Sequence, residues 1–204
     1  APMLRLIFAA ALLAGLARAE PRAAFDRLSR AEPGVRAVWR AGQSTPGLIL
    51  GLRVALAGRT AEQAARSLFA RHRALFAPSM ELVDQSPTSL RFRQLHGGLS
   101  VVEREARVRV KAGRIVSINN AMAPLARVEA AKIDLEQAKA LARAHLELPA
   151  SHPATGRKVV LANGDQGVEA FEIELSRMPL AESLVVRVDA AAGAVLGVHD
   201  RIKR

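Results

Sequence analysis

A strict alternation of apolar and charged residues over 105–111, which reads EARVRVK, constrains the fold more than any other feature of the chain. Successive side chains of a strand point to opposite faces, so this pattern predicts a strand with one dry face and one wet face. The Ala112-Gly113 turn then leads into a second apolar run, which favours an antiparallel meander. The dry face of such a sheet needs a helix to cover it.

Two helices with the same start signal are predicted to provide that cover. Thr60 and Gln63 form a capping box, in which each side chain pairs with the other residue's backbone amide, and an apolar face follows as far as Phe76. Asp134 and Gln137 repeat the signal before a second helix, and the segments AEQAARSLFARH and LEQAKALARAH read alike. The sequence therefore predicts an α+β fold built from two helix-on-antiparallel-sheet modules.

The chain begins with the features of a secretory signal peptide. Arg5 precedes an apolar run over 6–16, and Ala17-Arg18-Ala19 offers a cleavage site of the small-x-small type. The run is too short to span a bilayer. We expect a signal peptide over 1–19, with Ala1-Pro2 as a two-residue remnant ahead of the first Met, and a secreted or periplasmic protein without a stable membrane anchor after cleavage.

Turn residues and the two helices divide the rest of the chain. The predicted parts are a weakly structured N-terminal segment over 20–47, a first module over 48–123, a connector over 124–133, and a second module with the C-terminal tail over 134–204.

The charge of the chain is strongly positive. Its 30 Lys and Arg against 19 Asp and Glu give a net charge of +11, and removal of the signal peptide would leave 28 against 19, or +9. Arg91, Arg93, Arg107 and Arg109 are predicted to share a sheet face. Readers of single-stranded nucleic acid need aromatic platforms on such a face, and none are interleaved there, so we expect no nucleic acid partner. An acidic protein surface suits the same charges.

Standard catalytic signatures are absent from the sequence. It contains no HExxH, GxSxG, Walker loop or dinucleotide fingerprint, and no cysteine for a thiolate site. His199 and Asp200 are neighbours on a predicted strand, so their side chains point to opposite faces and form no pair. Glu172 and Glu174 do share a face, and an acid/base pair there competes with the more ordinary interpretation of a solvated sheet face. We expect no enzyme activity, no metal and no cofactor in this chain.

The order of motifs resembles the fungalysin/thermolysin propeptide (FTP) domain. That family shows a helix, a strand of the form RFxQ, a turn leading to G-[LV]-P-V, a strand of alternating valines, and a final strand G-x-[VI]-x-S-[VI]-x-[GN]. The matching positions here are Arg91, Phe92, Gln94, Gly98, Leu99, Val101, Val108, Val110, Gly113, Ile115, Ser117 and Ile118.

The second module resembles the PepSY domain that follows in such propeptides. The segments that carry this likeness are a DLEQAKALA helix, an FEIEL strand, and a hairpin V-D-A-x-x-G-x-[VI]-[LI] on Val188, Asp189, Ala190, Gly193, Val195 and Leu196. Together the two resemblances cover about two thirds of the chain and imply a cystatin-like packing of one helix across each sheet.

The resemblance implies the prosegment of a secreted thermolysin-like or fungalysin-like zinc metallopeptidase. Such prosegments act as intramolecular chaperones and keep the zymogen inactive, with their last residues near the active-site cleft. The implied partner is the peptidase catalytic domain, in cis or in trans, and the implied contact residues are His199, Asp200, Lys203 and Arg204. The four arginines are a further candidate contact on the ground of charge alone. Any peptidase activity would reside in a downstream domain absent from this chain.

The sequence departs from the family pattern at three places. Ser100 stands where Pro is usual, Glu103-Arg104 replaces a small, Gly-containing segment, and Phe171 stands where PepSY often has Tyr. Two other functions stay open: a stand-alone exported protease inhibitor or protein-binding module, and a cell-envelope or polyanion binder that uses charge alone.

Overall fold

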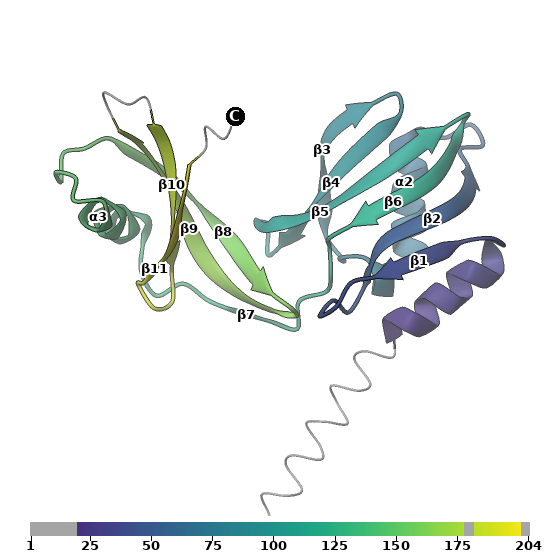
Figure 1. Ribbon diagram of the computed structural model, residues 1–204, viewed down its shortest axis with the longest axis horizontal. Coiled ribbons are helices and arrows are strands. Elements are labelled where there is room, and N and C mark those ends of the chain that lie inside the picture. The colour runs from purple at the N-terminus through teal and green to yellow at the C-terminus, as the bar shows by residue number, and fades with distance from the viewer. Residues whose placement is uncertain (1–19, 178–181, 201–204) are drawn as a thin grey trace, which may run out of the picture. The chain divides into compact units, whose positions relative to one another are not determined.

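The computed structural model describes residues 20–177 and 182–200, which form two compact units of an α+β protein (Figure 1). The first unit holds the described residues up to Leu95 together with Glu103–Pro124. The second holds His96–Val102 and the described residues from Leu125 onward. The predicted signal peptide lies outside the described residues. Within those residues, no helix is both long enough and apolar enough to cross a membrane.

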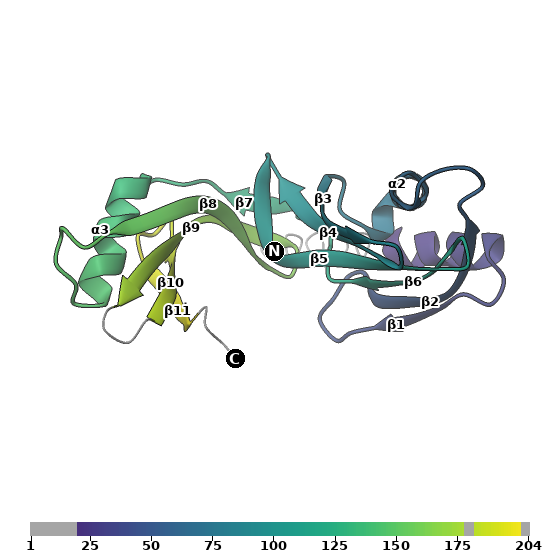
Figure 2. The same ribbon diagram turned by 90° about the horizontal axis from the view of Figure 1, so that it is seen from above.

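The first unit is a sheet with helices on its apolar side. Its strands follow the order β1-β2-β6-β5-β4-β3, and β4 and β5 extend across the division between the units. The pairs β1·β2, β2·β6, β5·β6 and β3·β4 are antiparallel, which agrees with the predicted meander for β3·β4 and β5·β6. Figure 2 shows α2 on one side of β2, β5 and β6. The strand bounds are β1 Arg36–Trp39, β2 Pro46–Ala55, β3 Met80–Ser86, β4 Ser89–His96, β5 Leu99–Lys111 and β6 Arg114–Asn120.

Helix α2 (Ala61–Arg71) begins at the predicted capping box. The Gln63 amide donates to the Thr60 hydroxyl at 3.1 Å, and the Thr60 amide donates to the Gln63 side chain at 3.0 Å. The Phe69 ring lies 5.2 Å from the Phe92 ring in the core beneath the helix. The chain turns into a 3-10 segment η1 (Arg73–Leu75) instead of continuing as a regular helix to Phe76. Pro78 disfavours helical backbone at the residue before it, which limits the helix from that side.

Residues 20–47 contain more regular structure than the sequence predicts. A helix over 20–31 buries Ala24 and Leu28 almost completely, and β1 follows it. The Phe25 ring meets the Trp39 ring edge-on at 6.2 Å, and Arg22 lies 4.7 Å from the Trp39 ring centroid. These are tertiary contacts with a strand, so local spacing alone does not predict them.

The second unit packs α3 (Leu135–His145) across the antiparallel sheet β8-β9-β10-β11. The Asp134–Gln137 capping box is confirmed, with bonds of 2.8 and 2.9 Å. The buried residues beneath α3 are Phe171, Ile173, Leu175, Val186, Val188 and Ala190. The strands are β8 Ala154–Asn163, β9 Gln166–Arg177, β10 Glu182–Asp189 and β11 Val195–Asp200, and β7 Arg127–Glu129 runs parallel to β9.

Glu169 on β9 connects the segment before α3 to the sheet by hydrogen bonding. Its carboxylate accepts the Ala131 amide at 2.9 Å and the Lys158 ammonium at 3.1 Å. The backbone hydrogen bond from Ala131 is the main reason that the pKa of Glu169 lies below its usual value, and Lys158 adds to the effect against a smaller opposing effect of burial. The charged form of Glu169 therefore stabilises the folded protein.

We expect Glu169→Gln to lower the free energy of unfolding at neutral pH by about 1 kcal/mol, because a charge-assisted bond becomes a neutral one. The folded-state pKa is lowered, so this contribution is present above the ordinary glutamate pKa and disappears as pH falls through the folded-state value. Urea unfolding of both proteins at several pH values measures the difference. A gap that stays constant down to strongly acidic pH would contradict the assignment, and Glu136→Gln on the surface of α3 is the control.

Candidate partner-binding faces

The four arginines singled out from the sequence divide into two pairs with different surroundings. Arg91 lies 4.0 Å from the Asp84 carboxylate and 3.6 Å from Glu105. Arg93 lies 3.5 Å from Glu81 and 3.7 Å from Glu105. Three carboxylates therefore surround these two guanidinium groups, which leaves them little net charge to offer a partner.

Arg107 and Arg109 occupy β5 at the same sheet side and are exposed. Each begins a row of residues that face one another across four strands. One row continues through Asn119, Leu48 and Val38, and the other through Ser117, Leu50 and Arg36. We call these eight residues the basic–apolar face.

The basic–apolar face is open and free of acidic groups. Val38 is 51% exposed and Leu50 is 41% exposed, unusual values for large apolar side chains within strands. Among the described residues, no carboxylate forms an ion pair with Arg36, Arg107 or Arg109. Strands β1, β2 and β6 contain no Asp or Glu, and on β5 the same-side Glu105 next to Arg107 contacts Arg91 and Arg93.

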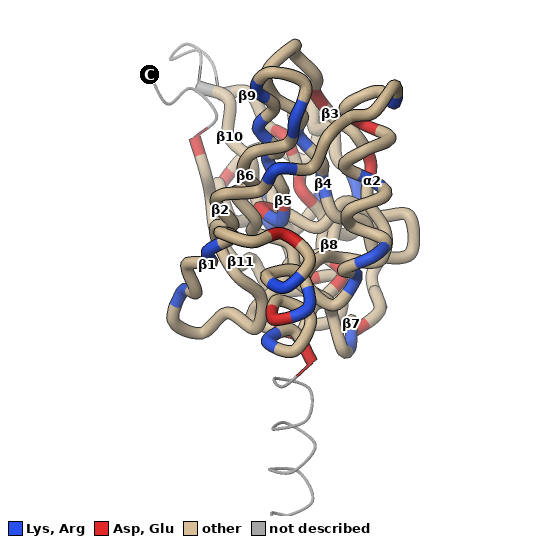
Figure 3. Tube along the Cα trace, turned by 90° about the vertical axis from the view of Figure 1, so that its right-hand side faces the viewer, with Lys and Arg blue, Asp and Glu red and all other residues tan. Residues whose placement is uncertain are grey.

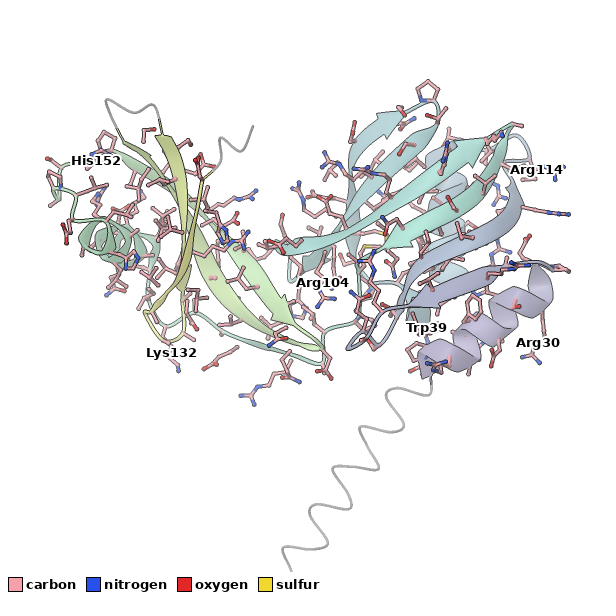
Figure 4. All side chains as sticks on the ribbon, viewed as in Figure 1. Arg30, Trp39, Arg104, Arg114, Lys132 and His152 are labelled. Atoms are coloured by element: carbon pink, nitrogen blue, oxygen red, sulfur yellow. The ribbon has the colours of Figure 1, made fainter. Side chains whose placement is uncertain are left out.

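Further cations adjoin this face. They are Arg53 on β2, Lys111 at the end of β5 and Arg114 at the start of β6, all exposed. Figure 3 colours the cationic positions of these strands blue, and Figure 4 labels Arg114 at the far end of the β5–β6 hairpin. The positive charge inferred from composition therefore has a defined location in the first unit.

The second unit holds a cross-strand ion cluster centred on Glu172 of β9. Glu172 is only 8% exposed, and the Arg157 guanidinium contacts its Oε2 at 2.7 Å while Arg187 Nε contacts its Oε1 at 3.2 Å. Both carboxylate oxygens are thus engaged by arginines from β8 and β10. This arrangement favours a structural ion cluster over the acid/base interpretation of Glu172 and Glu174.

The predicted C-terminal contact residues lie partly within the described chain. His199 pairs in register with Val185 and Asp200 with Leu184, so the two side chains point to opposite faces of β11 as expected. His199 is exposed. Lys203 and Arg204 lie outside the described residues.

Asn120 is a buried polar residue that sequence reasoning missed. Its side-chain amide donates to the carbonyl oxygens of Pro46 at 3.2 Å, Leu75 at 3.1 Å and Met122 at 3.2 Å. Its Oδ1 accepts the Met122 amide at 3.1 Å. One side chain therefore joins β2, the segment after α2 and the end of β6.

Gln94 and Thr45 also form hydrogen bonds to the segment at the end of β6, at Met122 and Ala123. Gln94 donates to the Ala123 carbonyl at 2.9 Å and accepts the Ala123 amide at 3.1 Å, and Thr45 donates to the Met122 carbonyl at 2.9 Å. All three polar side chains of this cluster are buried. The signal in the sequence was a polar residue at a core-facing strand position, as in Leu90-x-Phe92-x-Gln94.

The described residues contain no group of three or more His, Asp or Glu that could hold a metal ion. A hollow of about 270 Å³ beside α2 is lined by Arg66, Phe69, Arg73 and Met80 among others. Arg66 is already paired with Glu62 at 2.7 Å.

Comparisons with known proteins leave the family undetermined. No protein-family model matches the chain, and no curated protein matches it. Among solved structures, the C-terminal domain of YpeB from Bacillus megaterium is similar, with 16% sequence identity, a TM-score of 0.36, and coverage of 76% of this chain and 71% of that one. A likeness of this extent does not identify a family.

Proposed function

We propose that this chain is the propeptide region of a secreted zinc metallopeptidase of the thermolysin or fungalysin kind. It is non-catalytic in this proposal, and it acts as an intramolecular chaperone and inhibitor by binding the peptidase domain. The zinc ion belongs to the partner. FTP-like and PepSY-like modules account for the first and second helix-on-sheet units.

The observation that supports this proposal most is that motif residues of the resemblance have identifiable physical tasks in the fold. Gln94, the last residue of the RFxQ motif, is a member of the buried polar cluster around Met122 and Ala123. Asn120, two residues after the motif residue Ile118, is the centre of the same cluster. Glu103, in the segment where the family has Gly, has a φ of 60°, a conformation that favours glycine.

The mechanism is physical. Proteases with many non-local contacts fold slowly, because long loops must close before those contacts form. A folded prosegment that binds the native-like peptidase stabilises that state by mass action and supplies a surface against which it forms. Inhibition requires in addition that the segment over 199–204 occupy the substrate cleft.

A stand-alone inhibitor or binding module that acts in trans is the second candidate. The basic–apolar face favours it, because an unpaired charged surface on the first unit suits a separate acidic protein. Binding to a peptidase encoded in another reading frame would support this alternative.

The proposed function is tested by adding purified residues 20–204, or residues 20–198, to a thermolysin-like peptidase and measuring peptide hydrolysis. We expect residues 20–204 to inhibit hydrolysis. Residues 20–198 should bind the peptidase at least about tenfold more weakly, which corresponds to a loss of about 1.4 kcal/mol of binding free energy. If the peptidase hydrolyses the peptide at the same rate alone, with residues 20–204 and with residues 20–198, the inhibitory role is contradicted.

A further inference from the structure

Arg36, Arg107 and Arg109 of the basic–apolar face form no ion pair with the described carboxylates, and the nearest acid along β5, Glu105, is engaged by Arg91 and Arg93. Several cations elsewhere are paired with carboxylates, among them Arg66 with Glu62 at 2.7 Å, Lys139 with Glu136 at 2.8 Å, and Arg157 with Glu172 at 2.7 Å. Protein surfaces usually intersperse both signs, since a single-sign patch repels itself. A patch of this kind beside exposed Val38 and Leu50 therefore calls for an explanation in terms of binding.

We propose that the basic–apolar face is a docking surface for a protein segment that carries an apolar side chain flanked by carboxylates. The apolar side chain packs on Val38, Leu48 and Leu50, and the carboxylates pair with Arg36, Arg107 and Arg109. The inference rests on the proposed function only in taking the partner to be a protein, and it names the chemistry by which that partner is recognised.

The arginine side chains of the basic–apolar face are longer than its valine and leucine side chains, and this difference determines which partner segment can bind. Neighbouring strands lie about 4.8 Å apart and alternate residues of a strand about 7 Å apart, so Arg36 and Arg109 lie on either side of Leu50 within the reach of their long side chains. Valine and leucine are shorter than arginine, so the apolar groups are recessed between cations. An apolar centre within a charged rim is the usual anatomy of a protein interface.

The same geometry disfavours other occupants. A planar anionic bilayer would meet the arginine tips first, and Val38 and Leu50 lie within strands, not at a protruding loop tip that could enter the acyl region. A polyanion without apolar groups would leave the recessed residues uncovered. A second copy of this face would bring like charges together.

The test uses ¹⁵N-labelled residues 20–204 and a peptide with one leucine between Glu-Asp and Asp-Glu, titrated to millimolar concentration while amide shifts are recorded. We expect shifts confined to β1, β2, β5 and β6 at the face residues, and a smaller effect when serine replaces the leucine. The Arg107→Ser/Arg109→Ser variant should weaken binding at least about tenfold, as loss of two charge pairs predicts. Arg127→Ser/Lys132→Ser removes the same charge from exposed sites of the second unit and is the matched control.

Leu50→Ser tests the apolar centre, with Leu196→Ser, at a leucine that is 50% exposed on β11, as its control. Absence of shifts, shifts elsewhere, or equal binding of the serine peptide would overturn the inference. Binding to phosphatidylglycerol vesicles in preference to the peptide would assign the face to a membrane surface instead. Peptide binding that the face variants lose, together with unchanged peptidase inhibition, would support the docking inference and leave the proposed function intact. Peptide binding without any peptidase inhibition would support the docking inference and contradict the proposed function.

Discussion

Replacing Asn120 with alanine is expected to lower the free energy of unfolding by about 3 kcal/mol, the effect of leaving several buried polar groups without partners. The Pro46 and Leu75 carbonyls would lose their side-chain donor and the Met122 amide its acceptor. The Met122 carbonyl would keep its bond from Thr45. Urea unfolding followed by circular dichroism measures the change.

Asn119→Ala provides the matched control, because the neighbouring residue is the same type on the opposite, exposed side of β6. Its effect should remain within about 0.5 kcal/mol, as for most surface substitutions. Similar losses in the two variants would show that the buried cluster does not have the role assigned to it.

Glu172→Ala is expected to cost about 3 kcal/mol, because it removes the nearly buried carboxylate that Arg157 and Arg187 share. Arg187 is the affected partner, since its side chain is only 20% exposed and contacts Glu172 at 3.2 Å. Arg157 is 60% exposed and recovers hydration more easily. Thermal and urea unfolding of the full chain report the loss.

Two further variants distinguish the effect of losing the ion cluster from the general effect of removing a carboxylate. Glu129→Ala removes an exposed carboxylate from the same unit and should change stability by less than about 0.5 kcal/mol. Glu172→Gln retains the shape but not the charge, so it should be less damaging than Glu172→Ala. A Glu172→Ala protein as stable as the parent would contradict a structural role for the cluster.

Local signals in the sequence predicted the helices and hairpins that depend on local chemistry. Both capping boxes and the one-sided strand over 105–111 are confirmed, because caps and alternation act between residues close in the chain. Strand β8 was missed, since the positions that pair with the core residues Leu175 and Ile173 hold the small Ala154 and Gly156, and only Val159 and Val160 are fully buried. A Cβ on Gly156 would lie 2.7 Å from the Ile173 side chain, which explains the missing apolar residue.

The candidate surface was predictable only in part. Alternation placed the four arginines on one wet side, but it did not reveal that Glu81, Asp84 and Glu105 lie beside two of them. The rows that join Val38 to Arg107 depend on strand register between segments far apart in the sequence. Register of this kind is set by tertiary packing and turn geometry together.

The proposal that the chain is a propeptide is tested most directly by reading the source genome beyond the codon for Arg204. The proposal predicts an open reading frame that continues into a segment with an HExxH zinc-binding motif, in which two histidines one helical turn apart hold the metal. A stop codon directly after Arg204 would contradict a propeptide acting in cis, and the trans-acting inhibitor or binding module would then become the leading function.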